Sequence, residues 1–354
     1  MGQVSSTFVA EAGDVCWLRA DVALAAAARH QAAQLARGVH LSAEHTARLE
    51  LCVTELATNL LKHAHDGALA LRVVRDRDRA AVECLSLDNG PGIEDVPRAL
   101  RDGTSATGTL GIGLGAVGRL ADESGVHSLR GRGTVVYARF WAAAAGGAAP
   151  EPQPHPVATG GLTRPISGEQ VCGDSWAVRA VSGHGPDALT LMMCDGLGHG
   201  PLAARAADRA REAFRDSRHM DPAAVLGDVH LGLRGTRGAA VAIALVDLGE
   251  ERVRLSGVGN ISALVASEGS RSGLLSVPGI VGVQLPRPRT FEAAFPPGSA
   301  LIMHSDGLSD RWKPADLPGL FAKDPSLVAA QILNQAAVRR DDAGIVVAVR
   351  GQRP

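Results

Sequence analysis

TELATNLLKHA, residues 54–64, is the most informative stretch of this sequence. Its apolar residues recur with the period of an amphipathic helix, which we expect over about 42–65. Glu55 and Asn59 stand four residues apart and therefore share one face of that helix. A carboxylate and an amide on one face can hold a magnesium ion or orient a hydroxyl group, although a solvated helix face has the same pattern.

A second stretch, LSLDNGPGI at residues 85–93, predicts a buried strand that ends at Asp88. A carboxylate at a strand end can accept a hydrogen bond from the amino group of a purine. Gly90 and Gly92 would allow the backbone to approach such a base closely. Taken alone, the motif is equally typical of a simple Asp-Asn-Gly turn.

A third stretch, residues 103–118, reads GTSATGTLGIGLGAVG. Gly111, Gly113 and Gly115 lie at the start of an expected helix, where backbone N–H groups form a cradle for phosphate. The spacing matches neither the dinucleotide-binding fingerprint nor a P-loop, which requires a lysine. The three motifs in this order predict a nucleotide site more strongly than any one of them does.

Outside these motifs, the hydrophobic pattern predicts an α+β protein that is divided into two domains. In the first half we expect further helices near 21–37 and 115–122, and strands near 68–75, 80–88 and 133–140. Residues 142–161 are rich in Ala, Gly and Pro and are predicted to be a linker between a domain of residues 1–141 and one of residues 162–354. In the second half, apolar strands alternate with helices near 201–216, 221–234 and 325–339.

Acidic residues follow or precede several strands of the second half. They are Asp174 in CGDSW, Asp195 in MMCDGLGHG, Asp306 in IMHSDGLSD, and Asp341 and Asp342 in RRDDAGIVVAV. Carboxylates that a sheet brings together repel one another and need a cation to neutralise them. The pattern predicts a pair of divalent ions that activate water for attack on a phosphate. His199 and His304 flank these motifs and are assigned structural roles, and Asn260 is assigned to a turn.

Composition excludes several classes of partner. With 354 residues the chain is long enough for two domains, and its net charge of -1 and 3% aromatic content argue against a nucleic-acid partner. No apolar run has the length of a membrane span, and no signal peptide is recognised. The five cysteines are scattered and never spaced as C-x-x-C, which is typical of reduced thiols. We therefore expect a cytoplasmic protein without a membrane partner.

On the three motifs of the first half, residues 1–141 resemble the GHKL ATP-binding family, and within it the serine kinases of bacterial partner-switching systems, the RsbT, RsbW and SpoIIAB group. The resemblance implies a Bergerat α/β sandwich that binds Mg-ATP. Asn59 would hold Mg²⁺ against the phosphates, Asp88 would read adenine, and Glu55 would accept the proton of an attacking serine. The family's two glycine boxes would correspond to Gly90 and Gly92, and to Gly111, Gly113 and Gly115.

Residues 162–350 resemble the metal-dependent serine/threonine phosphatases of the PPM type, in the SpoIIE, RsbU and RsbX branch. The motifs GDSW, DGLGHG, GVGN, HSDGLSD and RDDA occur in the family's order. The resemblance implies an α/β/β/α sandwich with two Mn²⁺ or Mg²⁺ ions. Asp195 would bridge both ions, the carbonyl of Gly196 would be an extra ligand, and Asp306 and Asp341 would complete the ligands.

Three further positions of the phosphatase motifs have a less direct role. Asp174 would lie beside the phosphate, and Asp342 would be a neighbour of the same metal site. Gly173 stands where eukaryotic members have an acidic residue, which implies a weaker metal affinity.

The two resemblances together imply a bifunctional regulator of a partner-switching pathway for stress or sigma-factor control. It would be a phosphoserine/phosphothreonine phosphatase fused to a serine-kinase-like domain, both acting on a STAS-domain protein. The alternative is a phosphatase whose first domain is a non-catalytic ATP-sensing or partner-binding switch.

Overall fold

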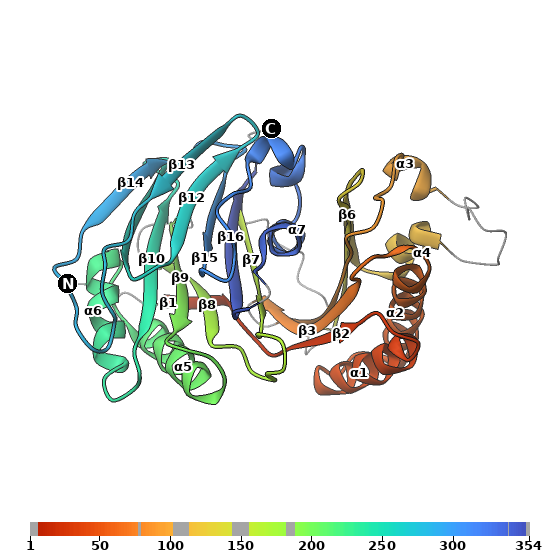
Figure 1. Cartoon of the computed structure of the whole chain (residues 1–354), viewed down its shortest axis with the longest axis horizontal. Helices are drawn as coiled ribbons and strands as arrows, with labels where there is room; N and C mark the ends of the chain where they lie inside the picture. Colours follow the sequence, from red (N-terminus) through yellow and green to blue (C-terminus); the bar gives the residue numbers. More distant parts are fainter. Residues whose placement is uncertain are drawn as a thin grey trace. The chain divides into compact units, whose positions relative to one another are not determined.

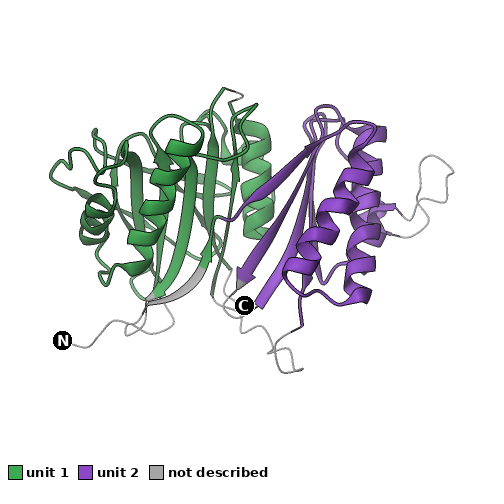
Figure 2. Ribbon diagram, turned by 90° about the horizontal axis from the view of Figure 1, so that it is seen from below, with its two compact units in different colours: residues 1–12, 153–354 green, residues 13–152 purple. Residues whose placement is uncertain are grey.

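A computed structural model describes residues 6–76, 79–101, 113–143, 156–181, 188–338 and 340–351. The chain forms two compact units: unit 1 combines residues 1–12 with 153–354, and unit 2 comprises residues 13–152 (Figures 1 and 2). Both units mix helices and strands, as the α+β prediction requires. Among the described residues, no helix is both long enough and apolar enough to cross a membrane.

Unit 2 is one antiparallel sheet with helices on one face (Figure 2). Its strands are β2 (Val15–Arg19), β3 (Ala68–Asp76), β4 (Arg79–Leu87), β5 (Glu123–Leu129) and β6 (Gly133–Trp141), and its helices are α1 (Leu24–Gly38), α2 (Ala43–His63), α3 (Val96–Ala99) and α4 (Gly113–Leu120). The strand order is β2-β3-β4-β6-β5. Apolar side chains of α1, α2 and α4 pack on the sheet to form the core of this unit.

Small residues and a helix cap explain how unit 2 packs with so few aromatic side chains. Ala28, Ala32 and Ala36 recur every fourth residue of α1 and are fully buried, so this helix lies close to its neighbours. The Ser42 hydroxyl accepts a hydrogen bond from the backbone N–H of His45 at 3.1 Å and fixes the start of α2. That start sets which face of α2 carries the predicted site residues.

Unit 1 is a sandwich of two antiparallel sheets. One sheet has the order β1-β8-β9-β10-β11-β14 and the other β13-β12-β15-β16-β7. The strands are β1 (Ser6–Glu11), β7 (Val157–Arg164), β8 (Asp174–Val181), β9 (Ala188–Gly196), β10 (Ala239–Asp247), β11 (Arg252–Val258), β12 (Ser262–Ser267), β13 (Ser270–Leu274), β14 (Thr290–Ala294), β15 (Ala300–His304) and β16 (Ala343–Arg350). A continuous apolar core fills the space between the two sheets.

Helices cover the outer faces of the sandwich, which gives the predicted α/β/β/α layers. They are α5 (Pro201–Asp216), α6 (Pro222–Gly232) and α7 (Pro325–Ala336), with the short 3₁₀ helices η1 (Pro314–Asp316) and η2 (Leu320–Ala322). A second apolar cluster lies between the first sheet and α5 and α6, and α7 packs on β7 and β16. Each of the three helices begins with a proline, which suits the first helical turn because its N–H group has no partner there.

The structure differs from the predicted boundaries at two strands. β1 lies within the predicted first domain, residues 1–141, but pairs with β8 of unit 1, with Ser6 opposite Val181. β7 begins inside the predicted linker, residues 142–161, of which residues 144–155 lie outside the described part. A Cβ on Gly161 would lie 2.6 Å from the Trp176 ring, so glycine is needed where this strand crosses the aromatic side chain. A glycine-rich strand of this kind has the composition of a linker.

Candidate functional site

The predicted carboxylates meet at one edge of the unit 1 sandwich. Asp174 at the start of β8 lies directly opposite Asp195 near the end of β9 in the antiparallel ladder. Asp306 follows β15, and Asp341 and Asp342 precede β16, which is the antiparallel neighbour of β15. The ends of these four strands therefore bring five carboxylates to the same edge, two from β8 and β9 of the first sheet and three from the segments that follow β15 and precede β16 in the second.

The electrostatics confirm that these side chains are close together. Burial, then the charges of Asp306, Asp341 and Asp342, raise the pKa of Asp195 from 3.8 to about 7. Burial and the charge of Asp195 raise the pKa of Asp174 well above its usual value. Mutual repulsion of this kind makes ionisation of the cluster costly without a counter-charge.

Hydrogen bonds hold two of the carboxylates in fixed orientations. The buried Ser305 hydroxyl donates to Oδ2 of Asp174 at 2.5 Å and accepts from the N–H group of Gly344 at 2.9 Å. The Asn260 amide donates to Oδ2 of Asp306 at 2.6 Å. Asn260, which the sequence assigned to a turn, therefore contacts the acidic cluster directly.

Asp342 is tied to the backbone. Its two carboxylate oxygens accept hydrogen bonds from the N–H groups of Ile166 at 2.7 Å and Gly173 at 2.8 Å. A Cβ on Gly173 would lie 2.8 Å from Oδ2 of Asp342 and 2.8 Å from Cβ of Ala203. The side chain that eukaryotic relatives were expected to carry at residue 173 has no room here, and Asp342 serves chiefly to join two loops.

The carboxylates at this edge of the sandwich are partly open to solvent. Asp306 and Asp341 are exposed, whereas Asp195 is half-buried and Asp174 is buried. Gly196 is buried, and its N–H group donates to the carbonyl oxygen of Gly173 at 3.0 Å. Repelling carboxylates with an accessible side suit a hard divalent cation, which prefers oxygen ligands.

The side chains do not enclose such a cation by themselves. In the described residues, no group of three or more His, Cys, Asp or Glu side chains is arranged to hold a metal ion. Magnesium in proteins usually keeps several waters and binds one or two carboxylates, so a full set of side-chain ligands is not required. The cluster fits a divalent cation through its charge and its oxygen donors.

The two predicted structural histidines make their hydrogen bonds outside the acidic cluster, but the charge of His199 opposes the raised pKa of Asp342 and that of His304 opposes the raised pKa of Asp306. His199 is exposed, with Nδ1 3.1 Å from Oε1 of Glu169. His304 is fully buried; its Nδ1 donates to the carbonyl oxygen of Ser305 at 2.8 Å, and Nε2 lies 3.3 Å from Asp310. His304, whose Nε2 lies nearby, lowers the pKa of Asp310 to about 2 together with the Ser262 hydroxyl and Arg271. The hydrogen bonds from Ser262 and Arg271 to Asp310 fix the loop that follows β15.

In unit 2, Glu55 and Asn59 share a face of α2 and are both half-buried. The helix packs on α4 and on β4. Asp88 comes directly after β4 and is half-buried, and burial raises its pKa. The N–H group of Asn89 donates to the carbonyl oxygen of His65 at 2.9 Å, which joins the end of this strand to the segment that follows α2.

The glycines around Asp88 are required by space. A Cβ on Gly90 would lie 2.7 Å from the carbonyl oxygen of His63, and one on Gly92, where φ is +74°, would overlap the carbonyl of Leu129. Their small size thus lets the loop pass close to two neighbouring segments.

The glycines of the second box lie at the start of α4. Gly113 has a φ of +66° and begins the helix, and Gly115 is buried within it. Gly111 lies outside the described residues. The structure therefore places Glu55, Asn59 and Asp88 on packed elements around the first glycine box, and gives no position for the preceding loop.

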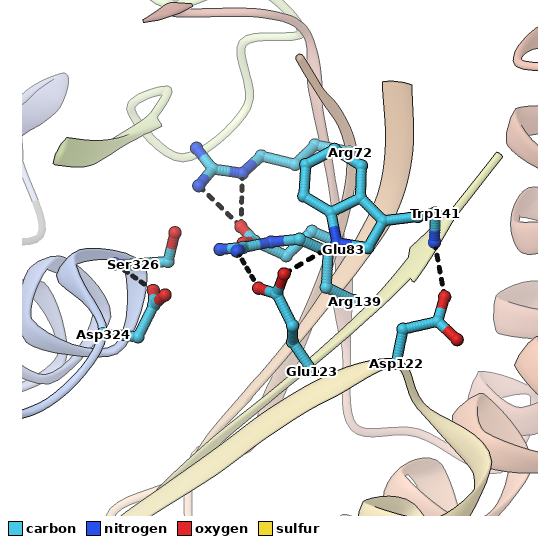
Figure 3. A network of polar contacts seen from close by, with 8 residues as sticks. All are labelled: Arg72, Glu83, Asp122, Glu123, Arg139, Trp141, Asp324 and Ser326. Atoms are coloured by element: carbon cyan, nitrogen blue, oxygen red, sulfur yellow. Dashed lines mark hydrogen bonds and ion pairs between the residues drawn. The ribbon is translucent and has the colours of Figure 1, made fainter. Parts of the chain in front are cut away.

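A buried ion network on the unit 2 sheet is not predicted by any sequence motif (Figure 3). Glu83 lies between Arg72, 2.6 Å away, and Arg139, 2.7 Å away. Arg139 also contacts Glu123 at 2.5 Å, and Glu123 accepts from the Trp141 indole at 2.8 Å. Burial opposes ionisation of Glu83, but the two guanidinium groups outweigh it and lower the pKa to about 2. Side-chain alternation puts Glu83 on the sheet face opposite the helices, away from Glu55 and Asn59.

Comparison with known proteins assigns each half of the chain. Residues 18–140 match the histidine kinase-like ATPase domain, and residues 183–348 match Stage II sporulation protein E (SpoIIE). Serine/threonine-protein kinase RsbT of Bacillus subtilis (strain 168) is 35% identical over 115 residues, which cover 32% of this chain and 86% of RsbT. Phosphoserine phosphatase RsbX of the same organism is 24% identical over 143 residues, which cover 40% of this chain and 70% of RsbX.

Among solved structures, one from work on the bacterial stressosome as a modular system adapted to control secondary messenger signaling is 31% identical. The match has a TM-score of 0.49 and covers 54% of this chain and 98% of that chain.

Proposed function

Because the chain belongs to the RsbT family of histidine kinase-like ATPase domains and also carries a SpoIIE domain, we propose that it is a bifunctional regulator of a partner-switching pathway. Unit 1 is a metal-dependent phosphoserine/phosphothreonine protein phosphatase. Unit 2 binds Mg-ATP and is a serine kinase. Both act on a STAS-domain protein, the substrate class that the kinase and phosphatase families imply.

The single observation that carries the phosphatase proposal is the convergence of five aspartates from two sheets, with the pKa of Asp195 raised to about 7. Such a cluster is stable in its ionised form only beside a cation. Asp195, Asp306 and Asp341, with the carbonyl of Gly196, would hold Mn²⁺ or Mg²⁺. A bound divalent ion offsets the charge of a phosphoryl group and makes water a better nucleophile near neutral pH.

The chain's own residues orient the reaction. Asp174 is fixed by Ser305 and lies opposite Asp195, so its carboxylate can accept a proton from water on the phosphate side of the cluster. Asn260 keeps Asp306 from rotating away. Asp342 joins the loop at Gly173 to the start of β16 and keeps the edges of the two sheets together.

In unit 2, Asn59 would hold Mg²⁺ against the ATP phosphates, and Asp88 would accept a hydrogen bond from the adenine amino group. Gly90 and Gly92 allow the loop after Asp88 to pack against the backbone of His63 and Leu129, which fixes the position of this carboxylate. Glu55, one helical turn before Asn59, would accept the proton of the substrate serine.

The phosphatase proposal is tested by phosphate release from p-nitrophenyl phosphate and from a phosphoserine peptide. We expect activity with Mn²⁺ or Mg²⁺, none after chelation with EDTA, and a loss of at least about 100-fold in Asp195→Ala and Asp306→Ala. Asp216→Ala, on the exposed end of α5, is the matched control and should keep full activity. Full activity in Asp195→Ala would refute the site.

The kinase proposal is tested with labelled ATP and a STAS-domain protein, in the Asp195→Ala background so that no phosphate is removed. We expect label on the partner, less in Glu55→Gln with ATP binding intact, and neither binding nor label in Asp88→Ala. Nucleotide binding without any transfer would leave unit 2 as an ATP-sensing or partner-binding switch.

A further inference from the structure

The turn between α6 and β10, residues 234–238 (RGTRG), presents an arginine from a rigid backbone. The Thr236 hydroxyl donates to the carbonyl oxygen of Leu233 at 2.7 Å and accepts from the N–H group of Gly238 at 3.0 Å. Gly235 and Gly238 have φ values of +82° and +83°, which favour glycine over other residues. Arg237 stands between these fixed points, so its backbone position is strongly constrained.

The strand register brings Arg237 to the loop that follows Asp195. In the ladder of β9 and β10, Asp195 pairs with Ala240 and Gly196 pairs with Ala239. The ladder continues past the strand ends, because the N–H group of Leu197 donates to the carbonyl oxygen of Gly238 at 3.1 Å. The next pair is Gly198 opposite Arg237.

The Arg237 side chain lies over the loop that follows Asp195. A Cβ on Gly198 would be 3.2 Å from Nη1 of Arg237, so the absence of a side chain at this position leaves room for the guanidinium group. The φ of Gly198 is +87°, which also disfavours any other residue. The guanidinium is thereby held against the backbone of the DGLG loop.

The guanidinium of Arg237 has its donors free. Arg237 is exposed, and within the described ranges its guanidinium donates no hydrogen bond and forms no ion pair. Two other arginines of unit 1, by comparison, contact carboxylates: Arg271 contacts Asp310 at 3.0 Å and Arg350 contacts Glu251 at 2.8 Å. A positive group with unused donors, presented over the loop that follows Asp195, is suited to bind an anion that also contacts a cation held by the carboxylates.

We propose that Arg237 binds the phosphoryl group of the substrate through its guanidinium. The proposal rests on the phosphatase function of unit 1, since it names the residue that recognises the phosphate there. A planar guanidinium can donate two parallel hydrogen bonds to phosphate oxygens, which a lysine cannot do. Arg237 would contact the phosphoryl group from the side of the DGLG loop. The cation held by the carboxylates would contact the same group from the other side.

The test compares Arg237→Ala and Arg237→Lys with wild type at saturating Mn²⁺. We expect kcat/KM for p-nitrophenyl phosphate to fall about 10- to 100-fold in Arg237→Ala, with partial recovery in Arg237→Lys. The inhibition constant of inorganic phosphate should rise by a similar factor, while the Mn²⁺ concentration for half-maximal activity stays unchanged. Arg234→Ala is the matched control, because Arg234 lies on the same turn and its charge acts on His230 instead. It should change neither constant more than about twofold.

Three outcomes would overturn the proposal. Unchanged constants in Arg237→Ala would exclude a role in binding phosphate. A defect confined to a phosphorylated protein, with p-nitrophenyl phosphate and phosphate inhibition unaffected, would assign Arg237 to a protein contact. A parallel shift of the Mn²⁺ midpoint would assign it to the metal site. A wild-type protein that hydrolyses no phosphomonoester would refute the phosphatase function as well, so the two failures are distinguishable.

Discussion

Replacing Asp195 by Asn should stabilise the metal-free protein while abolishing its activity. In the folded protein, burial and three neighbouring carboxylates raise the pKa of Asp195 from 3.8 to about 7. Each tenfold change in proton affinity is worth about 1.4 kcal/mol, so ionisation of Asp195 at high pH costs the fold up to about 4 kcal/mol. Asparagine keeps the shape of the side chain without the charge. We expect a gain of about 2–4 kcal/mol at about pH 8, because water at the open edge screens part of the repulsion.

The raised pKa of Asp195 determines how the stability of the wild-type protein changes with pH. A carboxyl group whose pKa is higher in the folded than in the unfolded state stabilises the fold fully below the unfolded value. That stability is lost as pH rises from about 4 to about 7. Wild type and Asp195→Asn should therefore have similar stability near pH 4 and diverge toward pH 8. Saturating Mn²⁺ should abolish the difference or reverse it, because the cation supplies the missing counter-charge to wild type alone.

The measurement is urea unfolding with EDTA, followed by tryptophan fluorescence at several pH values. Each unit contains two tryptophans, so the transition of unit 1 is identified as the one that Mn²⁺ moves in wild type. Asp216→Asn removes the same charge from an exposed site of unit 1 and should change stability by no more than about 0.5 kcal/mol. An Asp195→Asn protein no more stable than wild type at pH 8 would refute the repulsion argument.

Three further predictions concern buried or closely packed residues of the two units. Glu83→Gln should cost unit 2 about 3–5 kcal/mol in urea unfolding, because the buried Arg72 and the half-buried Arg139 both lose the charge of Glu83; a loss below 1 kcal/mol would contradict the network. Gly92→Ala should cost about 2–4 kcal/mol and weaken ATP binding, whereas Gly131→Ala, with a similar φ of +72° and open space around it, should cost about 1–2 kcal/mol; equal losses would exclude the overlap. Ser305→Ala should cost about 1–3 kcal/mol and lower kcat, because a buried N–H group and Asp174 both lose a partner; unchanged kcat would remove Ser305 from the site.

The parts of the fold that sequence could predict depend on local patterns. α2 has a cap, an apolar stripe and a defined end, so its position and the shared face of Glu55 and Asn59 follow from a short segment. The aspartates of unit 1 stand at strand ends beside strongly apolar runs, and strand ends of one sandwich meet at its edges. The carboxylate cluster could therefore be predicted without any knowledge of which strands pair.

The parts that sequence could not predict depend on partners far apart in the chain. Glu83 looks like an ordinary polar residue of a strand until Arg72 and Arg139 arrive from the two neighbouring strands. Arg237 lies over the loop that follows Asp195 only because β10 pairs with β9 in one particular register, and a shift of one residue would turn it away. The sequence at Gly173 implies a weaker metal affinity, but it does not reveal that Asp342, from the other end of unit 1, fills the space beside this glycine.

The path of the chain makes unit 2 an insertion into unit 1. β1 and β7 are edge strands of the two sheets and pack against each other, and residues 13–152 lie between them in sequence. The chain thus leaves and re-enters unit 1 at neighbouring points, the arrangement in which a host domain tolerates an inserted one. A fragment that begins at residue 162 would lack β1 and most of β7 and would expose the unpaired edges of β8 and β16. The phosphatase sandwich is therefore complete only when the first strand of the chain is present, so its N-terminal boundary lies before the kinase-like unit.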